Sequence, residues 1–235
     1  MTQIRALVFD VDGTLAETEE VHRDAFNRAF HEAGLGWHWS IKDYRSLLET
    51  TGGKERMIRY RDSIGATAPT NDTIAELHFR KTQIYSETVL GGQLPLRDGV
   101  AELIEFAREL GLKIAVATTT NRSNVEALCQ ACWQCSGDEV FDEIAAGDEV
   151  AQKKPAPDVF LLALERLGVA ASEAIAFEDS LNGVHSARRS QLEVVVTPSM
   201  YTSHQDFSEA TWVVENLRQG TLPVDLKERL SSRAL

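Results

Sequence analysis

The chain has few cysteines, no long apolar run and fewer basic than acidic residues. Its three cysteines are odd in number and too few for a disulfide framework in 235 residues. The longest apolar stretches, such as IAVA at 114–117, are far too short to span a bilayer. The N-terminal segment MTQIRALVFD shows no cleavage-site pattern of a signal peptide. These absences predict a cytoplasmic protein that does not insert into a membrane.

The charge balance narrows the range of partners. Lysine plus arginine number 24 against 36 aspartates and glutamates, so the formal net charge is −12. Such an acidic surface repels nucleic-acid phosphates and anionic lipids, which argues against both as partners. An anionic substrate therefore needs local cations, from side chains or from a metal. The length and the apolar fraction of 43% fit a globular protein with a substantial core.

Short apolar runs alternate with amphipathic stretches from residue 95 onward. Apolar residues three and four apart, with Gly111 and Gly168 as stop signals, predict helices. Unbroken apolar strands separated by helices predict a parallel sheet covered on both faces, an α/β fold with a Rossmann-like, doubly wound core. The predicted strands are 4–9, 112–120, 141–148, 173–180 and 192–198, and the predicted helices are 100–111, 123–133, 158–168 and 181–190, with another after Gly220.

Residues 16–94 break this alternation. They contain successive helical stretches at 18–35, 54–65 and 71–90, punctuated by glycines. Such a segment, placed directly after the first strand, predicts a small helical domain inserted into the α/β core. The predicted domains are a core of residues 1–15 and 95–235 and a helical domain of residues 16–94.

Two carboxylates, Asp10 and Asp12, follow the first predicted strand with one residue between them. If the strand continues through them, both side chains point to the same side. Ligands of open α/β sheets bind in the crevice beyond the carboxyl ends of the strands. Carboxylates that converge there raise each other's pKa and need a cation, and oxygen ligands beside a phosphate favour Mg²⁺. The other polar residues at strand ends are Thr118, Thr119, Thr120, Lys153, Lys154, Glu178 and Asp179.

These motifs together resemble the haloacid dehalogenase superfamily, especially its phosphotransferases with an aspartate nucleophile. The resemblance is carried by DVDGT at 10–14, Thr118 after an apolar strand, KKPAPD at 153–158 and FEDSLNGV at 177–184. The insertion directly after the first motif is similar to that of the β-phosphoglucomutase-like branch. Within that branch, the segment TTGGKERM at 50–57 resembles the CbbY-type sugar-bisphosphate phosphatases associated with the Calvin cycle.

The resemblance implies a two-step phosphoryl transfer. Asp10 attacks phosphorus and forms an aspartyl-phosphate, while Asp12 protonates the leaving oxygen and later takes a proton from water. The Mg²⁺ ion is held by Asp10, the Asp12 carbonyl and Asp179, with Glu178 binding it directly or orienting its waters. Thr118 and the backbone N–H of Thr119 hold a phosphoryl oxygen, and Lys154 balances the charge of the transferred group.

The predicted helical domain is expected to act as a cap that closes over the crevice and selects the substrate. The loop at Gly52 and Gly53 can bring backbone N–H groups to a phosphate, and Lys54 can bring an ammonium group to it. Glu17 is expected to bind sugar hydroxyls, and His22 resembles the hinge-side histidine of the mutase branch. Most arginines of the helix after Lys54 are expected in solvent, and one can reach a second phosphate.

The CbbY-type resemblance implies xylulose-1,5-bisphosphate as the substrate. A sugar phosphomutase uses the same nucleophile and acid/base residue, and one sequence does not separate the two activities. A non-catalytic regulator that binds phosphorylated metabolites is a third alternative, against which the intact motif residues weigh. Cys129, Cys132 and Cys135 are expected to be small buried hydrophobes rather than metal ligands, and Lys153 is expected at the surface. We expect a monomer.

Overall fold

The strands form one parallel sheet whose order differs from their order in the chain. The computed structural model describes residues 2–92 and 94–231, and the predicted domains also include residues 1, 93 and 232–235, which lie outside this range. Within the described residues, the sheet is six-stranded with the order β3-β2-β1-β4-β5-β6. Its strands are β1 (Ala6–Phe9), β2 (Lys113–Ala117), β3 (Glu143–Ala145), β4 (Ala174–Glu178), β5 (Glu193–Val196) and β6 (Trp212–Val213).

The register of the central strands aligns their carboxyl ends. Phe9, the last residue of β1, pairs with Val116 of β2 and with Phe177 of β4. The backbone N–H of Asp10 then donates to the carbonyl of Phe177 at 2.9 Å, which fixes the chain just beyond the strand. Because parallel strands end at the same edge, the polar residues that follow them meet there.

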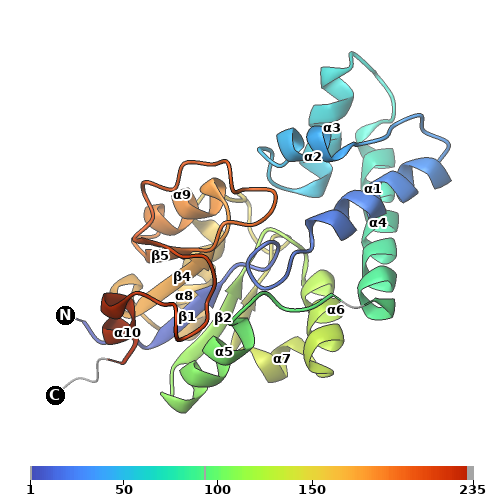
Figure 1. Ribbon diagram of the computed structural model, residues 1–235. Coiled ribbons are helices and arrows are strands. Elements are labelled where there is room, and N and C mark those ends of the chain that lie inside the picture. Colours follow the sequence, from blue (N-terminus) through green and yellow to red (C-terminus); the bar gives the residue numbers. More distant parts are fainter. Residues whose placement is uncertain (1, 93, 232–235) are drawn as a thin grey trace.

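Side chains of different size cover the two faces of the sheet. Successive residues of a strand point to opposite faces, so Leu7 and Phe9 of β1 lie on one side and Ala6 and Val8 on the other. The face with the larger side chains packs against α5 (Val100–Glu109), α6 (Arg122–Trp133) and α10 (Val224–Ser231). The alanine-rich face packs against α8 (Asp158–Leu167) and α9 (Leu181–Arg189). The predicted doubly wound α/β core is confirmed (Figure 1).

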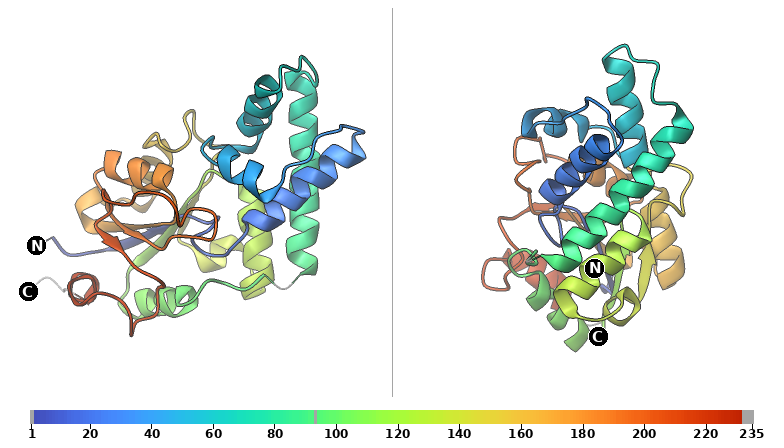
Figure 2. Two further views of the ribbon diagram at one scale, coloured as in Figure 1. Left: turned by 45° about the horizontal axis from the view of Figure 1, so that its top comes forward. Right: turned by 90° about the vertical axis from the view of Figure 1, so that its right-hand side faces the viewer.

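The helices between β1 and α5 form a group beside the carboxyl end of the sheet, which we call the helical insertion (Figures 1 and 2). An aromatic core that includes Phe26, Phe30, Trp39 and Tyr44 holds them together. Tyr201 of the α/β core packs into the same cluster. The insertion comprises α1 (Glu19–Glu32), α2 (Ile41–Leu47), α3 (Gly53–Ser63) and α4 (Asn71–Gly91).

Most predicted elements are present, but their ends differ. The predicted strand 112–120 ends at Ala117, because the Thr118 N–H makes a last bond to the Ala145 carbonyl and the chain then bends at Thr119 and Thr120. Helix α2 and the short strand β6 were not predicted, because both are too short for a clear periodicity. The same holds for α7 (Gly137–Val140). No helix within residues 2–92 and 94–231 is both long enough and apolar enough to cross a membrane.

The glycine that directly precedes α5 provides a test of the core. Gly99 has φ +86°, and a Cβ there would collide with the backbone of Leu217 and Arg218. Gly111 has a similar φ of +71°, with nothing within 4 Å of the corresponding position. We expect Gly111→Ala to lower the free energy of unfolding by about 1 kcal/mol through backbone strain alone. Gly99→Ala should cost about 1–3 kcal/mol more, because the backbone must move. Urea unfolding measures both, and equal losses would contradict this packing.

Candidate active site

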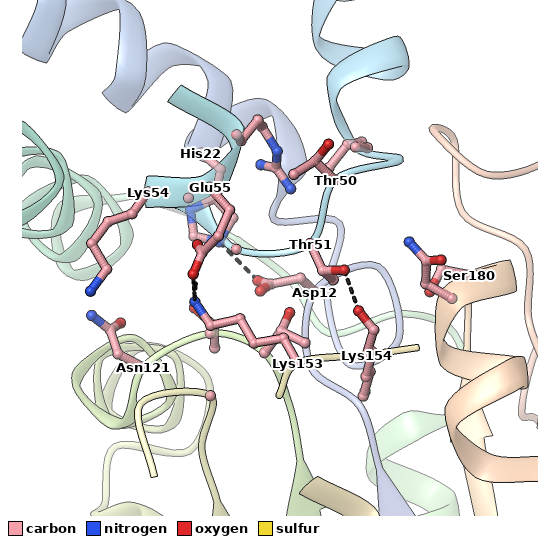
Figure 3. Close-up of a pocket in the computed structure, with 18 of the residues that line it drawn as sticks. Asp12, His22, Thr50, Thr51, Lys54, Glu55, Asn121, Lys153, Lys154 and Ser180 are labelled. Atoms are coloured by element: carbon pink, nitrogen blue, oxygen red, sulfur yellow. Dashed lines mark hydrogen bonds and ion pairs between the residues drawn. The ribbon is translucent and has the colours of Figure 1, made fainter. Parts of the chain in front are cut away.

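A cavity of about 860 Å³ lies between the helical insertion and the carboxyl ends of the strands (Figure 3). Its walls bring together residues that are far apart in the sequence. The predicted site residues among its lining are Asp10, Asp12, His22, Gly52, Gly53, Lys54, Thr119, Lys154 and Asp179.

A single ammonium group lies among the buried carboxylates at the floor of the cavity. Lys154 Nζ donates to Asp10 Oδ1 at 2.6 Å, to Glu178 Oε1 at 2.6 Å and to the Ala117 carbonyl at 2.7 Å. Burial lowers the pKa of Lys154, but Asp10 and Glu178 outweigh this and raise it. Lys154 therefore stays charged and links the ends of β1, β2 and β4.

When all three are ionised, the carboxylates of this cluster carry more negative charge than Lys154 can balance. Ligand oxygens of Asp10, Glu178 and Asp179 all lie within 4.8 Å of one another. Burial, and then the Glu178 carboxylate, raise the pKa of Asp179 to about 8, although Thr202 Oγ1 donates to Asp179 Oδ2 at 3.1 Å. A buried, oxygen-only set with excess negative charge fits a hard divalent cation such as Mg²⁺.

Two glycines leave room for these carboxylates. A Cβ on Gly183 of α9 would overlap the carboxyl group of Glu178, and a Cβ on Gly13 would overlap that of Asp179. Gly13 also has φ +85°, a conformation that glycine adopts without strain. Each motif therefore includes a glycine that leaves space for an acidic residue.

Asp12 has different partners, all from the helical insertion and its first linker. Its Oδ1 accepts from Thr18 Oγ1 at 2.6 Å. The same oxygen lies 3.0 Å from His22 Nε2 (Figure 3). Burial would raise the pKa of Asp12, but His22 and Thr18 lower it to about 2. Asp12 is therefore ionised in this arrangement.

The protonation state of His22 depends on Lys81, a residue that was not predicted from the sequence to be in the site. Lys81 Nζ of α4 lies 2.6 Å from His22 Nδ1, and both side chains are buried. Burial, and then Lys81, lower the pKa of His22. A neutral His22 accepts from Lys81 at Nδ1 and donates from Nε2 to Asp12. Burial also lowers the pKa of Lys81 itself, to about 7.

Several predicted residues lie elsewhere than expected. Glu17 is not among the described residues that line the cavity, because its carboxylate pairs with Arg97 Nε at 3.2 Å on another side of the linker. Thr118 is buried behind the lining, where its Oγ1 accepts from the Thr120 N–H at 3.2 Å. Lys153 is not a free surface residue, since its Nζ lies 3.1 Å from both carboxylate oxygens of Glu55.

Cationic side chains line the part of the cavity formed by the insertion. Lys54 extends from the start of α3 along the wall near Asn121 (Figure 3). Arg56 is 8% exposed, and its Nη1 donates to the Tyr44 hydroxyl at 2.8 Å. Its Nε has no partner among the described residues. Tyr44 in turn donates to Glu19, which lines the cavity, at 2.8 Å.

Comparison with known proteins identifies the class. Residues 4–191 match the family model of the haloacid dehalogenase-like hydrolases. A curated relative, protein CbbY of Rhodobacter capsulatus, is 55% identical over 215 residues, with 92% of this chain and 94% of that protein covered. The chain therefore belongs to the haloacid dehalogenase-like hydrolase family, in its CbbY group. The predicted family and the predicted phosphatase class are confirmed.

Solved structures give the same assignment. The crystal structure of CbbY from Rhodobacter sphaeroides in complex with phosphate has a TM-score of 0.88 at 46% identity. The superposition covers 92% of this chain and 96% of the CbbY chain. A mutant of that protein, solved in complex with xylulose-(1,5)bisphosphate, has the same TM-score, identity and coverage.

The raised pKa of Asp179 predicts that binding of a divalent cation at this cluster depends on pH. Since the pKa of Asp179 is about 8 in the folded protein and 3.8 as a free side chain, the folded state binds this proton more tightly. Metal-free stability therefore falls as pH rises between these values, and Mg²⁺ gains by replacing the proton. We expect Mg²⁺ to raise the Tm more at about pH 8 than at about pH 5. Thermal unfolding with and without Mg²⁺ measures the difference.

Two variants control for other titrating groups. Asp179→Asn should remove most of the Mg²⁺ response at both pH values, because a predicted ligand and its titration are lost together. Asp138→Asn changes an exposed carboxylate that pairs with Arg122 and should keep the full response. A Mg²⁺ response that is independent of pH in the wild type would contradict the exchange of a proton for the ion at Asp179.

Proposed function

We propose that this phosphatase hydrolyses a sugar bisphosphate, xylulose-1,5-bisphosphate, to a sugar monophosphate and phosphate. The observation that carries the proposal is a single cavity with a carboxylate cluster at one end and cationic side chains of the insertion at the other. A sugar with one phosphate near the carboxylates, balanced there by Lys154 and a divalent cation, and a second phosphate near the cations would match this distribution. The relative solved with xylulose-(1,5)bisphosphate supports the same substrate.

Asp10 is the proposed nucleophile. Its Oδ1 is held by Lys154 at the end of β1, and its side chain lines the cavity. A carboxylate fixed in this way needs little reorganisation to attack phosphorus in line and form an aspartyl-phosphate. Water then hydrolyses the acyl phosphate and regenerates Asp10.

Asp12 is the proposed general acid and base. Ionised Asp12 is the form that accepts a proton from the hydrolytic water in the second step. The first step needs the protonated form, and a phosphate dianion beside Asp12 favours it by raising its pKa. His22 and Thr18 hold the same oxygen of Asp12, so the acid/base group is oriented by the insertion.

Charge on the transferred group is balanced from the core side. Asp10, Asp179 and the Asp12 carbonyl, with Glu178 in support, would hold Mg²⁺, which would supply positive charge to the phosphoryl oxygens. Lys154 adds a fixed positive charge next to Asp10, within 2.6 Å of its carboxylate. Thr118 shapes the turn whose backbone N–H groups are proposed to bind a phosphoryl oxygen.

The distal phosphate is proposed to bind between Lys54 and Arg56 at the start of α3. Gly52 has φ +93° as the N-cap of α3, so the turn at Gly52 and Gly53 brings the helix N-terminus into the cavity wall. Such an end favours anions through its free N–H groups. The unpartnered Nε of Arg56 supplies a further donor.

We further propose that residues 16–94 form a cap that closes over the substrate. Direct contacts already join the insertion to the core across the cavity: Glu55 with Lys153 at 3.1 Å, and Asn182 Nδ2 with the Glu49 carbonyl at 3.2 Å. Thr51 Oγ1 also donates to the carbonyl of Lys154. Closure of this kind excludes bulk water and strengthens electrostatic interactions inside the site.

Replacement of the nucleophile tests the chemistry. We expect Asp10→Asn to reduce phosphate release from xylulose-1,5-bisphosphate by at least about 10³-fold, because an amide cannot form the acyl phosphate. Asp138→Asn serves as the matched control and should keep wild-type activity. Phosphate release in the presence of Mg²⁺ measures both. Asp10→Asn that releases phosphate at the wild-type rate would refute the mechanism, and isomerised sugar phosphate without free phosphate would identify a mutase.

Removal of a cap cation tests the distal site. We expect Lys54→Ala to raise KM for the bisphosphate by about tenfold, which corresponds to about 1.4 kcal/mol of lost binding. kcat and the KM for a sugar monophosphate should change less than about twofold, because only the distal group contacts Lys54. Lys227→Ala on α10 is the control for a loss of one positive charge. An unchanged KM for the bisphosphate would exclude Lys54 from the site.

A further inference from the structure

The two linkers between the core and the insertion lie side by side. They are next to the loop after β1 that carries Asp10 and Asp12, which we call the nucleophile loop. Ala16 of the first linker forms an isolated bridge with Asp12 and another with Leu96 of the second linker. The backbone N–H of Arg97 donates to the Leu15 carbonyl at 2.8 Å. Any movement of the insertion about its linkers therefore acts next to the segment that carries Asp10 and Asp12.

The guanidinium of Arg97 donates hydrogen bonds to carbonyl groups of two loops of the core. Its Nη1 donates to the Gly13 carbonyl and, at 2.7 Å, to the Thr197 carbonyl. Its Nη2 donates to the Pro198 carbonyl at 2.9 Å. Its Nε lies 3.2 Å from Glu17 Oε1, and the Arg97 side chain is only 15% exposed. The forked guanidinium thus binds one carboxylate and three backbone carbonyls at once.

Each of the two loops holds a part of the active site. Gly13 follows Asp12 directly in the nucleophile loop. The other loop continues from Pro198 into Ser199, whose backbone N–H donates to Thr202 Oγ1 at 2.9 Å. Thr202 Oγ1 donates in turn to Asp179 Oδ2 at 3.1 Å. Arg97 therefore contacts both the loop that carries Asp12 and the loop whose Thr202 donates to Asp179.

We propose that Arg97 is a positioning residue for the phosphatase reaction. Its guanidinium holds the nucleophile loop in register with the loop that contains Thr202, and it couples both loops to the linkers of the insertion. It does not line the cavity among the described residues, so it acts through the residues it holds. The proposal rests on Asp10 and Asp12 as the reacting groups, as argued above.

Only arginine fits this position. Three carbonyls and a carboxylate converge from different directions, and a guanidinium presents five N–H groups in one rigid plane. A lysine keeps the charge, but its ammonium is a compact group that cannot reach all four partners. Buried carbonyls left without a donor are free to shift towards water, which moves the loops that carry them.

The test compares Arg97→Lys with Arg218→Lys, a nearby arginine that pairs with Asp98 at 3.1 Å and is 56% exposed. We expect Arg97→Lys to lower kcat for phosphate release by about tenfold or more, with KM within about twofold of the wild type. Hydrogen exchange supplies a readout that does not depend on activity. The amides of Gly13, Thr14 and Leu15, which bond within the loop, should exchange at least about tenfold faster.

The outcomes separate positioning from general stability. Faster exchange confined to the loop, together with the split between kcat and KM, supports the proposal. An unchanged kcat in a folded Arg97→Lys protein, or exchange that rises equally in β1 and β4, overturns it. Arg97→Gln, which keeps two N–H donors, is the second variant, and unfolding of both variants also counts against a positioning role. If the wild type releases no phosphate, the proposed function fails, while the exchange experiment still tests Arg97.

Discussion

The site depends on one electrostatic constraint: buried carboxylates share a single ammonium group. Removing charges from water is costly unless each charge has close partners. Lys154 satisfies part of this requirement for Asp10 and Glu178, at 2.6 Å each, and Asp179 lies beside them with a pKa of about 8. Full ionisation of all three carboxylates leaves an excess of negative charge, which a divalent cation can balance. The parallel register of β1, β2 and β4 is what holds these groups at such short range.

The two aspartates of the first motif differ because their environments differ. Asp10 faces the core, where burial and neighbouring carboxylates raise its pKa against the effect of Lys154. Asp12 faces the insertion, where His22 and Thr18 lower its pKa to about 2. Groups that are two residues apart in the chain thus differ in protonation behaviour because their surroundings differ. The insertion supports the chemistry directly, through the chain from Lys81 to His22 to Asp12.

The sequence predicted the core better than the insertion, for physical reasons. Apolar periodicity and strand-end polar residues located the sheet, and the register then brought Asp10, Lys154 and Asp179 together as expected. The expectation for Asp12 depended on a strand that continues, but β1 ends at Phe9 and the chain turns. The contact of Glu17 with Arg97 could not be predicted, because a linker has no periodicity from which the direction of a side chain follows. Lys81 gave no signal, since its link to His22 is a tertiary contact between α1 and α4.

An acidic protein can bind an anionic sugar because its charge is unevenly distributed. The formal net charge of −12 disfavours anions at long range, yet screening limits that repulsion to about 10 Å at ordinary salt concentrations. Inside the cavity Lys54, Arg56, Lys81 and Lys153 lie close together, and burial together with the charges of Lys81, Lys153 and Lys54 lowers the pKa of His78 to about 3. This histidine therefore stays neutral, so the cations around it are not increased further. The field of these nearby cations, rather than the net charge, therefore acts most strongly on a molecule inside the cavity.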